Sequence, residues 1–253
     1  MSLEQEFAGQ QCSSGQSLEQ MVLAAATAAK EASSVLALSS LEQRNHALEQ
    51  MAAALQENKE RILAANEADM AAARQAGTKE SLLDRLFLDE ARINDMASAL
   101  LDLVKLDDPL GRVLENRALY NGMNLKRVTV PLGVVAVIYE ARPNVTVDAA
   151  GICLKSGNAV VLRGGSLAVR STGALWRVLS EAAERAGLPV SCIVGIDSTD
   201  HAATDALMQL HGLVDVLVPR GGAGLIAHCV ECSKVPVIET GTGNCHVYVH
   251  ESA

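Results

Sequence analysis

The sequence predicts an α/β protein in which a Rossmann-like, doubly wound parallel sheet follows a set of N-terminal helices. Beyond residue 131, short apolar runs typical of buried strands alternate with helix patterns, as they do in βαβ units. Aromatic residues make up only 2% of the chain, so Leu, Val, Ile and Ala must fill the core, as in parallel sheets covered by helices. Three of the expected strands run into loops rich in Arg, Gly or Asn, the place where open α/β sheets bind their ligands.

The first 110 residues are predicted to be a disordered tail followed by helices. Residues 1–16 are rich in Gln, Ser and Gly, which is typical of a tail. Residues 17–110 form the helical region, in which Ser17 and Ser40 each stand three residues before a Gln, as in a capping box. Within this region we expect helices over 17–38, from 40 to a break at 64–69, over 78–86 and over 89–103.

A β-hairpin and a Rossmann-like region make up the rest of the chain. Residues 111–131 are the predicted hairpin, because Asn121-Gly122 is a strong turn signal between two strand patterns. Residues 132–253 are the predicted Rossmann-like region. Its expected strands cover 132–139, 158–163, 191–196, 214–218 and 235–238, and its expected helices cover 145–155, 167–187, 199–210 and 222–232.

Charge and cysteine content narrow the class of protein. The chain has 253 residues and a formal net charge of −9, and it lacks basic runs, so nucleic-acid binding is not expected. The N-terminus does not resemble a signal peptide, which has a basic stretch followed by an apolar one. The longest apolar runs are far shorter than the ~20 residues of a membrane span. Both observations indicate a soluble cytoplasmic protein without membrane contact. The six cysteines are scattered, as is typical of reduced cytosolic thiols: Cys12, Cys153, Cys192, Cys229, Cys232 and Cys245.

Two glycine-rich loops are candidate phosphate sites, because each follows a predicted strand and precedes a predicted helix. In the loop 163–166, glycines allow backbone N–H groups to approach an anion, and the guanidinium of Arg163 can pair with a phosphate. The loop 219–224 has the same chemistry but lacks the G-x-G-x-x-G spacing of the ordinary dinucleotide fingerprint. The competing interpretation of the loop 163–166 is a plain strand–helix turn with a surface arginine. For the loop 219–224 it is close packing of a helix on the sheet, which also needs glycine.

The turn after the first strand carries Arg142 and Asn144. The guanidinium can hold a substrate carboxylate or phosphate, and the side-chain amide can donate to a developing oxyanion. The competing interpretation is structural, because Asn144 can also cap a helix behind a turn fixed by Pro143.

Two further groups of polar residues lie near the end of the chain. Glu239 is a candidate general base, whereas Cys245 and His246 are neighbours in an expected strand and point to opposite faces, which argues against a nucleophile pair. Cys229 and Cys232 form a single C-x-x-C near a predicted helix end. A zinc site needs four ligands, so we interpret them as ordinary helix residues and predict no metal site.

Four segments together resemble the family of gamma-glutamyl phosphate reductases, the glutamate-5-semialdehyde dehydrogenases of proline biosynthesis within the aldehyde dehydrogenase superfamily. These segments are residues 131–148, 155–165, 218–225 and 243–249. The resemblance extends from about residue 17 onward and implies an aldehyde-dehydrogenase-like fold. It also implies a reaction in which NADPH reduces L-glutamyl 5-phosphate to L-glutamate 5-semialdehyde with release of phosphate, through a cysteine thioester.

The resemblance also implies roles for single residues. Arg163 takes the place of the cofactor-loop lysine, and Ser166 replaces a glutamate of many NAD-dependent relatives, which favours the 2′-phosphate of NADPH. Glu239 aligns with the superfamily's general base, while Arg142 and Asn144 lie in the substrate-side loop. The predicted cofactor-binding residues are Tyr139, Arg163, Gly164, Gly165, Ser166, Pro219, Arg220, Gly221, Gly222 and Gly224.

The family's nucleophilic cysteine stands in a Thr-Cys-Asn context that this sequence lacks. We therefore expect the chain to be a cofactor-binding portion, truncated before the catalytic domain and inactive alone. The alternatives are a non-catalytic nucleotide-binding module of aldehyde dehydrogenase origin and an acylating aldehyde dehydrogenase with another substrate. For the full-length protein, the resemblance implies a homo-oligomer and functional coupling to glutamate 5-kinase.

Overall fold

The computed structural model describes residues 17–239 and 246–252. Four parallel strands form its central sheet in the order β5–β4–β3–β6. In this sheet Val135 of β3 stands between Val160 of β4 and Val216 of β6. The predicted α/β fold with a parallel sheet is therefore confirmed. The strands are β3 (Val134–Tyr139), β4 (Ala159–Arg163), β5 (Ile193–Gly195) and β6 (Val216–Arg220).

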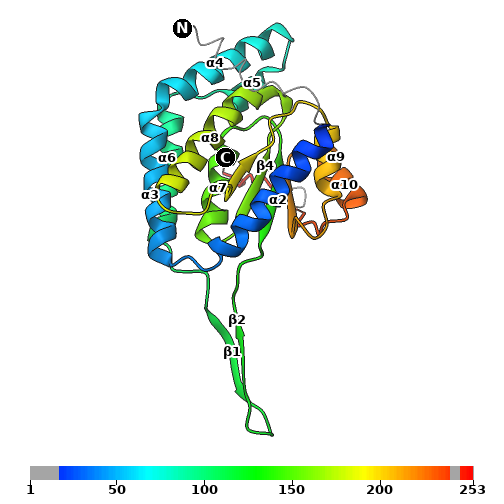
Figure 1. Cartoon of the computed structure of the whole chain (residues 1–253). Coiled ribbons are helices and arrows are strands. Elements are labelled where there is room, and N and C mark those ends of the chain that lie inside the picture. Colours follow the sequence, from blue (N-terminus) through cyan, green and yellow to red (C-terminus); the bar gives the residue numbers. More distant parts are fainter. Residues whose placement is uncertain (1–16, 240–245, 253) are drawn as a thin grey trace.

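Helices cover both faces of the sheet, as a doubly wound fold requires (Figure 1). Val135 and Val137 of β3 face a core shared with α7 and α8, and α3 and α6 pack outside these two helices. Ala136 and Ile138 face the opposite core, shared with α2 and α9. The helices are α2 (Leu18–Leu36), α3 (Leu41–Glu57), α4 (Lys59–Gln75), α5 (Glu80–Leu86), α6 (Glu90–Lys105), α7 (Asn144–Lys155), α8 (Val169–Arg185), α9 (Ala202–Met208) and α10 (Ala223–Cys232).

Four of the N-terminal helices, α2, α3, α5 and α6, begin within two residues of their predicted starts. Ser17 and Ser40 each accept a hydrogen bond from the backbone N–H three residues on, and the Gln side chain at that position accepts one in return. Both arrangements are complete capping boxes. Asp89 caps α6 by accepting a hydrogen bond from the backbone N–H of Arg92 at 2.8 Å.

The predicted helix break at residues 64–69 is wrong. Helix α4 is uninterrupted, and the break comes earlier, at Asn58. The polar residues that suggested a break are buried against neighbouring elements. Asn66 accepts a hydrogen bond from a backbone N–H of the loop before α6, and Asp69 accepts two from Ser171, at 2.8 and 2.7 Å. These residues interrupt the apolar pattern because they tie α4 to the start of α8.

The predicted strand 235–238 is reduced to a bridge between Val237 and Leu217 of β6. Two backbone hydrogen bonds to Leu217 link this segment to the sheet, whereas a strand needs a longer run of pairs. The residues that follow, 240–245, lie outside the described part of the chain. Strand β6 itself extends to Arg220, two residues beyond the prediction, because Arg220 still pairs with Tyr139 of β3.

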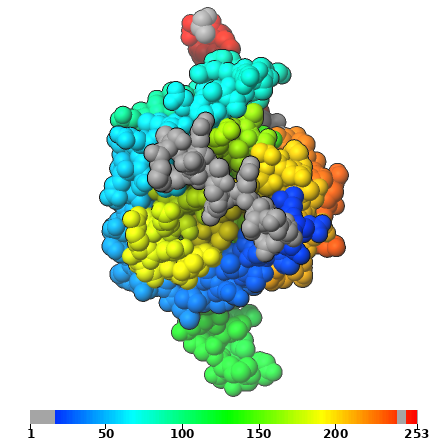
Figure 2. All heavy atoms as spheres, turned by 45° about the horizontal axis from the view of Figure 1, so that its top comes forward, coloured from blue at the N-terminus to red at the C-terminus, as the bar shows by residue number. Residues whose placement is uncertain are grey.

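The predicted hairpin is confirmed and projects from the body of the molecule (Figures 1 and 2). Its strands, β1 (Val113–Ala118) and β2 (Asn124–Val128), pair in antiparallel fashion, and all of their residues are exposed. Gly122 in the turn has a φ of +84°, a value that favours glycine. The hairpin therefore depends on its base for a fixed orientation.

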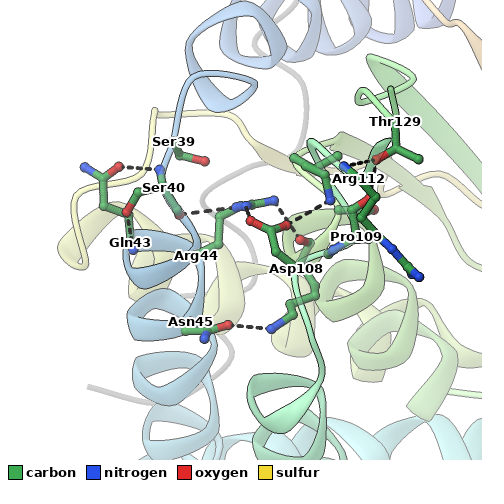
Figure 3. A network of polar contacts seen from close by, with 12 residues as sticks. Ser39, Ser40, Gln43, Arg44, Asn45, Asp108, Pro109, Arg112 and Thr129 are labelled. Atoms are coloured by element: carbon green, nitrogen blue, oxygen red, sulfur yellow. Dashed lines mark hydrogen bonds and ion pairs between the residues drawn. The ribbon is translucent and has the colours of Figure 1, made fainter. Parts of the chain in front are cut away.

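A polar network around the buried side chain of Arg44 anchors that base (Figure 3). Arg44 of α3 is only 1% exposed, and it donates to the carbonyl of Lys155 at 2.9 Å and to Asp108 Oδ2 at 2.8 Å. Asp108 in turn accepts from the backbone N–H of Leu110 at 3.0 Å. Thr129, just after β2, donates to the carbonyl of Pro109 at 2.7 Å. The network joins α3 and α7 to both chain segments that enter the hairpin.

Substitution of Arg44 by methionine is expected to lower the free energy of unfolding by about 2 kcal/mol, because Asp108 and a buried carbonyl lose their partner. Urea denaturation followed by circular dichroism measures this change. Arg61→Met is the matched control, since Arg61 is exposed on α4 and should change stability by less than about 0.5 kcal/mol. Equal losses in the two variants would contradict the role of the network.

Candidate functional site

The order of the strands places a switch point between β3 and β6. The chain leaves β3 through α7 to β4 and through α8 to β5, and it returns through α9 to β6 on the other side of β3. The carboxyl ends of β3 and β6 meet there, where the N–H of Glu140 donates to the carbonyl of Arg220 at 3.3 Å. Open α/β sheets bind ligands in the crevice at such a point.

A cavity of about 310 Å³, the switch-point cavity, lies at this crevice. Three exposed arginines line it, one from α5, one from the turn after β3 and one from the end of β6. No carboxylate among residues 17–239 and 246–252 forms an ion pair with them, so their charges are open to an anion. The lining residues are Leu82, Arg85, Tyr139, Glu140, Ala141, Arg142, Val145, Arg220, Gly221 and Gly222.

The glycine loop after β6 borders this cavity at the start of α10. The N–H of Gly222 donates to Glu140 Oε1 at 3.1 Å, so the carboxylate occupies the place that an anion takes at a helix N-terminus. A Cβ on Gly221 would lie 2.7 Å from Cδ of Glu140, so a larger residue there would displace the end of the Glu140 side chain. Around Gly224 nothing lies within 4 Å of a built Cβ, so packing does not require glycine there.

The loop 163–166 also reaches Glu140, and an acidic side chain already occupies the start of the α-helix that follows it. A Cβ on Gly165 would lie 3.2 Å from Cα of Glu140, so close packing accounts for this glycine. Asp69 accepts hydrogen bonds from the backbone N–H groups of Arg170 and Ser171, and it therefore occupies the N-terminus of α8. A structural role thus accounts for Gly165, but the predicted alternative of a surface arginine is wrong, because Arg163 is buried.

Arg163 is buried beneath the loop that follows β5. It is 4% exposed, and it donates to the carbonyl of Asp200 at 3.1 Å. Its Nε has no hydrogen-bond partner among the described residues, and burial lowers the pKa of the guanidinium. Ser166 is exposed at the start of a short 3₁₀ helix. Arg163 therefore has an unused donor, but the loop over it must shift before a phosphate can reach it.

The remaining predicted site residues differ in their burial and in their contacts. Tyr139 is buried, its hydroxyl lies 2.7 Å from Thr146 Oγ1, and burial raises the pKa of the phenol. Pro219 is buried within β6. Asn144 begins α7 without capping it, and its amide donates to Asp148 at 3.4 Å, so the predicted alternative of a helix cap is not found. Glu239 is exposed beyond Ile238 and does not line the switch-point cavity.

Four cysteines lie in the described part of the chain, while Cys12 and Cys245 lie outside it. Cys153 and Cys192 are buried, and burial raises the pKa of each thiol to about 12. The C-x-x-C pair lies in the last turns of α10, where Cys229 is buried and Cys232 is exposed. No group of three His, Cys, Asp or Glu side chains within the described ranges is arranged to hold a metal ion.

At pH 8 a thiol reagent is expected to modify Cys232 well before the three buried cysteines, because the thiolate is the reactive form and the buried thiols stay protonated. Cys232 is exposed, with its Sγ 3.5 Å from His228 Nδ1. Peptide mapping by mass spectrometry after timed alkylation separates the sites. Early modification of Cys153 or Cys192 in the folded chain would contradict their placement in the core.

Sequence reasoning missed Arg85 and gave Glu140 no role. Arg85 comes from α5, more than fifty residues before the turn that it faces, and no local motif marks it. Glu140 stands two residues before Arg142 in the sequence, but its contact with Gly222 depends on the pairing of β3 with β6.

The family model of the aldehyde dehydrogenase family matches residues 9–253. The chain belongs to the aldehyde dehydrogenase family. Within that family, the predicted resemblance to gamma-glutamyl phosphate reductases is confirmed. The protein of that name from Moorella thermoacetica is 55% identical to this chain over 225 residues, which cover 89% of this chain and 54% of the relative.

Two crystal structures of proteins with the same name support this aldehyde dehydrogenase fold. The structure from Thermotoga maritima superposes with a TM-score of 0.86 at 40% sequence identity. The matched part covers 89% of this chain and 54% of the Thermotoga maritima chain. The structure from Saccharomyces cerevisiae gives a TM-score of 0.79 at 31% identity, with 88% and 56% covered. The chain thus spans about half the length of the relatives it matches. No helix in the described ranges has the length and apolarity needed to cross a membrane.

Proposed function

We propose that this chain is the NADPH-binding part of an enzyme that reduces L-glutamyl 5-phosphate to L-glutamate 5-semialdehyde and releases phosphate. The observation that carries the proposal is the arginine-lined cavity at the switch point of the sheet. The high identity to relatives named gamma-glutamyl phosphate reductase supports the choice of substrate. Enzymes of the aldehyde dehydrogenase family use nicotinamide cofactors, and their diphosphate suits a glycine loop at a helix N-terminus.

The donors around the cavity fit a cofactor with several negative charges. Gly221 offers a backbone N–H group at the start of α10, and Gly222 offers a second one once Glu140 gives it up. Arg220 offers a guanidinium beside them. The unused Nε of Arg163 supports a role toward the 2′-phosphate, and Ser166 adds no charge that would repel it. NADPH, when bound, supplies the reducing hydride, while these residues of the chain hold and orient it.

Glu140 competes with the diphosphate in this proposal, because its carboxylate already accepts from Gly222. Glu140→Gln keeps the shape and removes the negative charge, so NADPH should bind roughly fivefold more tightly, a gain of about 1 kcal/mol. Isothermal titration calorimetry measures this change. Glu57→Gln, on an exposed carboxylate at the end of α3, is the control and should leave the affinity unchanged. Weaker NADPH binding by Glu140→Gln would instead indicate that the Glu140 carboxylate holds the glycine loop after β6 in place.

The nucleophilic cysteine is proposed to lie outside the four described cysteines. None of them lines the switch-point cavity, and the pKa of both Cys153 and Cys192 is raised to about 12, which disfavours the thiolate. Asn144 stays the candidate oxyanion donor and Glu239 the candidate base. The homo-oligomer, the coupling to glutamate 5-kinase and the cytoplasmic location also stay predictions.

A chimaera tests the whole proposal. Residues 17–252 of this chain replace the matching part of the Moorella thermoacetica relative, and the reverse reaction is assayed as phosphate-dependent reduction of NADP⁺ by glutamate 5-semialdehyde. We expect activity in the chimaera and none in the isolated chain. A folded chimaera that turns over other aldehydes but not glutamate 5-semialdehyde would contradict the proposed substrate. Activity of the isolated chain would contradict the proposal that this chain lacks the nucleophilic cysteine.

The cofactor preference is tested on the chain itself. We expect NADPH to bind more tightly than NADH, and Arg163→Ala to remove most of this preference while NADH binding changes little. If the variant keeps the full preference for NADPH, the 2′-phosphate is not held by Arg163.

A further inference from the structure

A second cavity, of about 480 Å³, lies beside the switch-point cavity and is lined by charges of both signs. Arg85 and Arg142 line both cavities, so the two are adjacent. The first turns of α7 contribute Asn144 and Asp148, and α6 contributes Asp95 from the opposite side. The volume lies within the range of small-molecule sites, roughly 300–1,000 Å³. We call this space the mixed-charge cavity.

Some of its charges are already paired and others are not. Arg92 donates to Asp84 Oδ1 at 2.8 Å, so these two side chains neutralise each other. In contrast, within residues 17–239 and 246–252 no cationic side chain forms an ion pair with Asp148, and no carboxylate forms one with Arg85 or Arg142. Asp95, which is exposed on α6, also forms no ion pair within these ranges, so the cavity offers two guanidinium groups and two carboxylates to a ligand. Of the two carboxylates, Asp148 is the more buried.

Asp148 is the side chain that most needs a partner. It is half-buried, and the one hydrogen bond that its side chain accepts among the described residues comes from the amide of Asn144, at 3.4 Å. Burial raises the pKa of its carboxyl group, as expected where no cation offsets the loss of water. Asn144 and Asp148 stand four residues apart on α7 and so share one face of the helix. An ammonium group beside Asp148 would offset the cost of burial.

We infer that the mixed-charge cavity holds the α-amino-acid head of the substrate, with Asp148 binding the α-ammonium group and Arg142, together with Arg85, binding the α-carboxylate. This inference rests on the proposed function, and it assigns specificity for an amino acid to residues outside the cofactor loops. A simple dicarboxylate lacks the group that Asp148 binds. A simple amine lacks the group that the arginines bind. A zwitterionic head satisfies both positions.

The test compares three ligands of the same length on the intact chain. L-Glutamate carries both head groups, glutarate lacks the α-ammonium, and 4-aminobutanoate lacks the α-carboxylate. Binding is followed by backbone amide shifts in the NMR spectrum, in wild type, Asp148→Asn and Arg142→Gln. Asp102→Asn, on an exposed carboxylate of α6, serves as control. NADPH is titrated into the same samples, so that failure of the cofactor site is seen separately.

In wild type we expect glutamate to bind at least about tenfold more tightly than either analogue, with the largest shifts in residues 142–148. Asp148→Asn should no longer bind glutamate more tightly than glutarate but should still bind it more tightly than 4-aminobutanoate. Arg142→Gln should no longer bind glutamate more tightly than 4-aminobutanoate but should still bind it more tightly than glutarate. A merely structural role would weaken all three ligands together. The inference is overturned if wild type binds NADPH but not glutamate, or if both variants keep the wild-type preferences.

Discussion

Replacement of Gly133 by alanine is expected to lower the free energy of unfolding by roughly 3–4 kcal/mol. Gly133 precedes β3 with a φ of +119°, a region that disfavours residues with a side chain. A Cβ built there overlaps Oδ2 of Asp215 and lies 2.9 Å from its Cγ. Asp215 would have to move, although it accepts from the N–H of Val134 at 2.8 Å and pairs with Lys30 at 2.7 Å. The variant therefore loses contacts among α2, β3 and β6 as well as backbone freedom.

Gly212→Ala separates the two causes. Gly212 has a comparable φ of +90°, but nothing lies within 4 Å of a Cβ built there, so it should lose only about 1–2 kcal/mol from backbone strain. Chemical denaturation of both variants gives the two free energies under the same conditions. Equal losses would mean that the chain accommodates the clash with Asp215 and that this carboxylate contributes little to the sheet.

The second large effect is expected at Arg220, whose replacement by glutamine should weaken NADPH binding by roughly 10- to 100-fold. Arg220 ends β6 next to the glycine loop and lines the switch-point cavity, and its side chain is exposed. A charge-assisted hydrogen bond to a phosphate contributes about 1.5–3 kcal/mol, which sets the size of the loss. The strand pairing of Arg220 uses its backbone alone, so the fold should not change.

Arg112→Gln is the matched control for this measurement, because Arg112 is an exposed arginine at the base of the hairpin. The control also corrects for the change in net charge, and it should bind NADPH as wild type does. Nicotinamide fluorescence gives both affinities. A loss of similar size in both variants would mean that general charge, and not the cavity, attracts the cofactor.

Local sequence patterns predicted those parts of the fold that local chemistry controls. The buried runs that became β3 and β4, the capping boxes at Ser17 and Ser40, and the Asn121-Gly122 turn each depend on neighbours in the sequence. The helix break failed for the opposite reason. The sequence alone suggests that Asn66 breaks the helix, because its hydrogen-bond partner, the backbone N–H of Leu88, lies twenty-two residues later.

The candidate site could be predicted only in part from the sequence. The loops after β3 and β6 were expected to carry ligand chemistry, and both line the switch-point cavity. The sequence could not reveal which hydrogen-bonding groups already have partners within the chain. Asp69 occupies the start of α8, Glu140 binds Gly222, and Asp200 covers Arg163, and each contact joins elements far apart in the chain.

The most direct test of the central claim is a titration of this chain with NADPH, followed by backbone amide shifts in the NMR spectrum. The claim is that the cavity between the ends of β3 and β6 binds the cofactor. We predict saturable binding, with the largest shifts at Gly221, Gly222 and the first turn of α10. Saturable binding with shifts confined to other surfaces, or no binding to a folded chain, would contradict the claim.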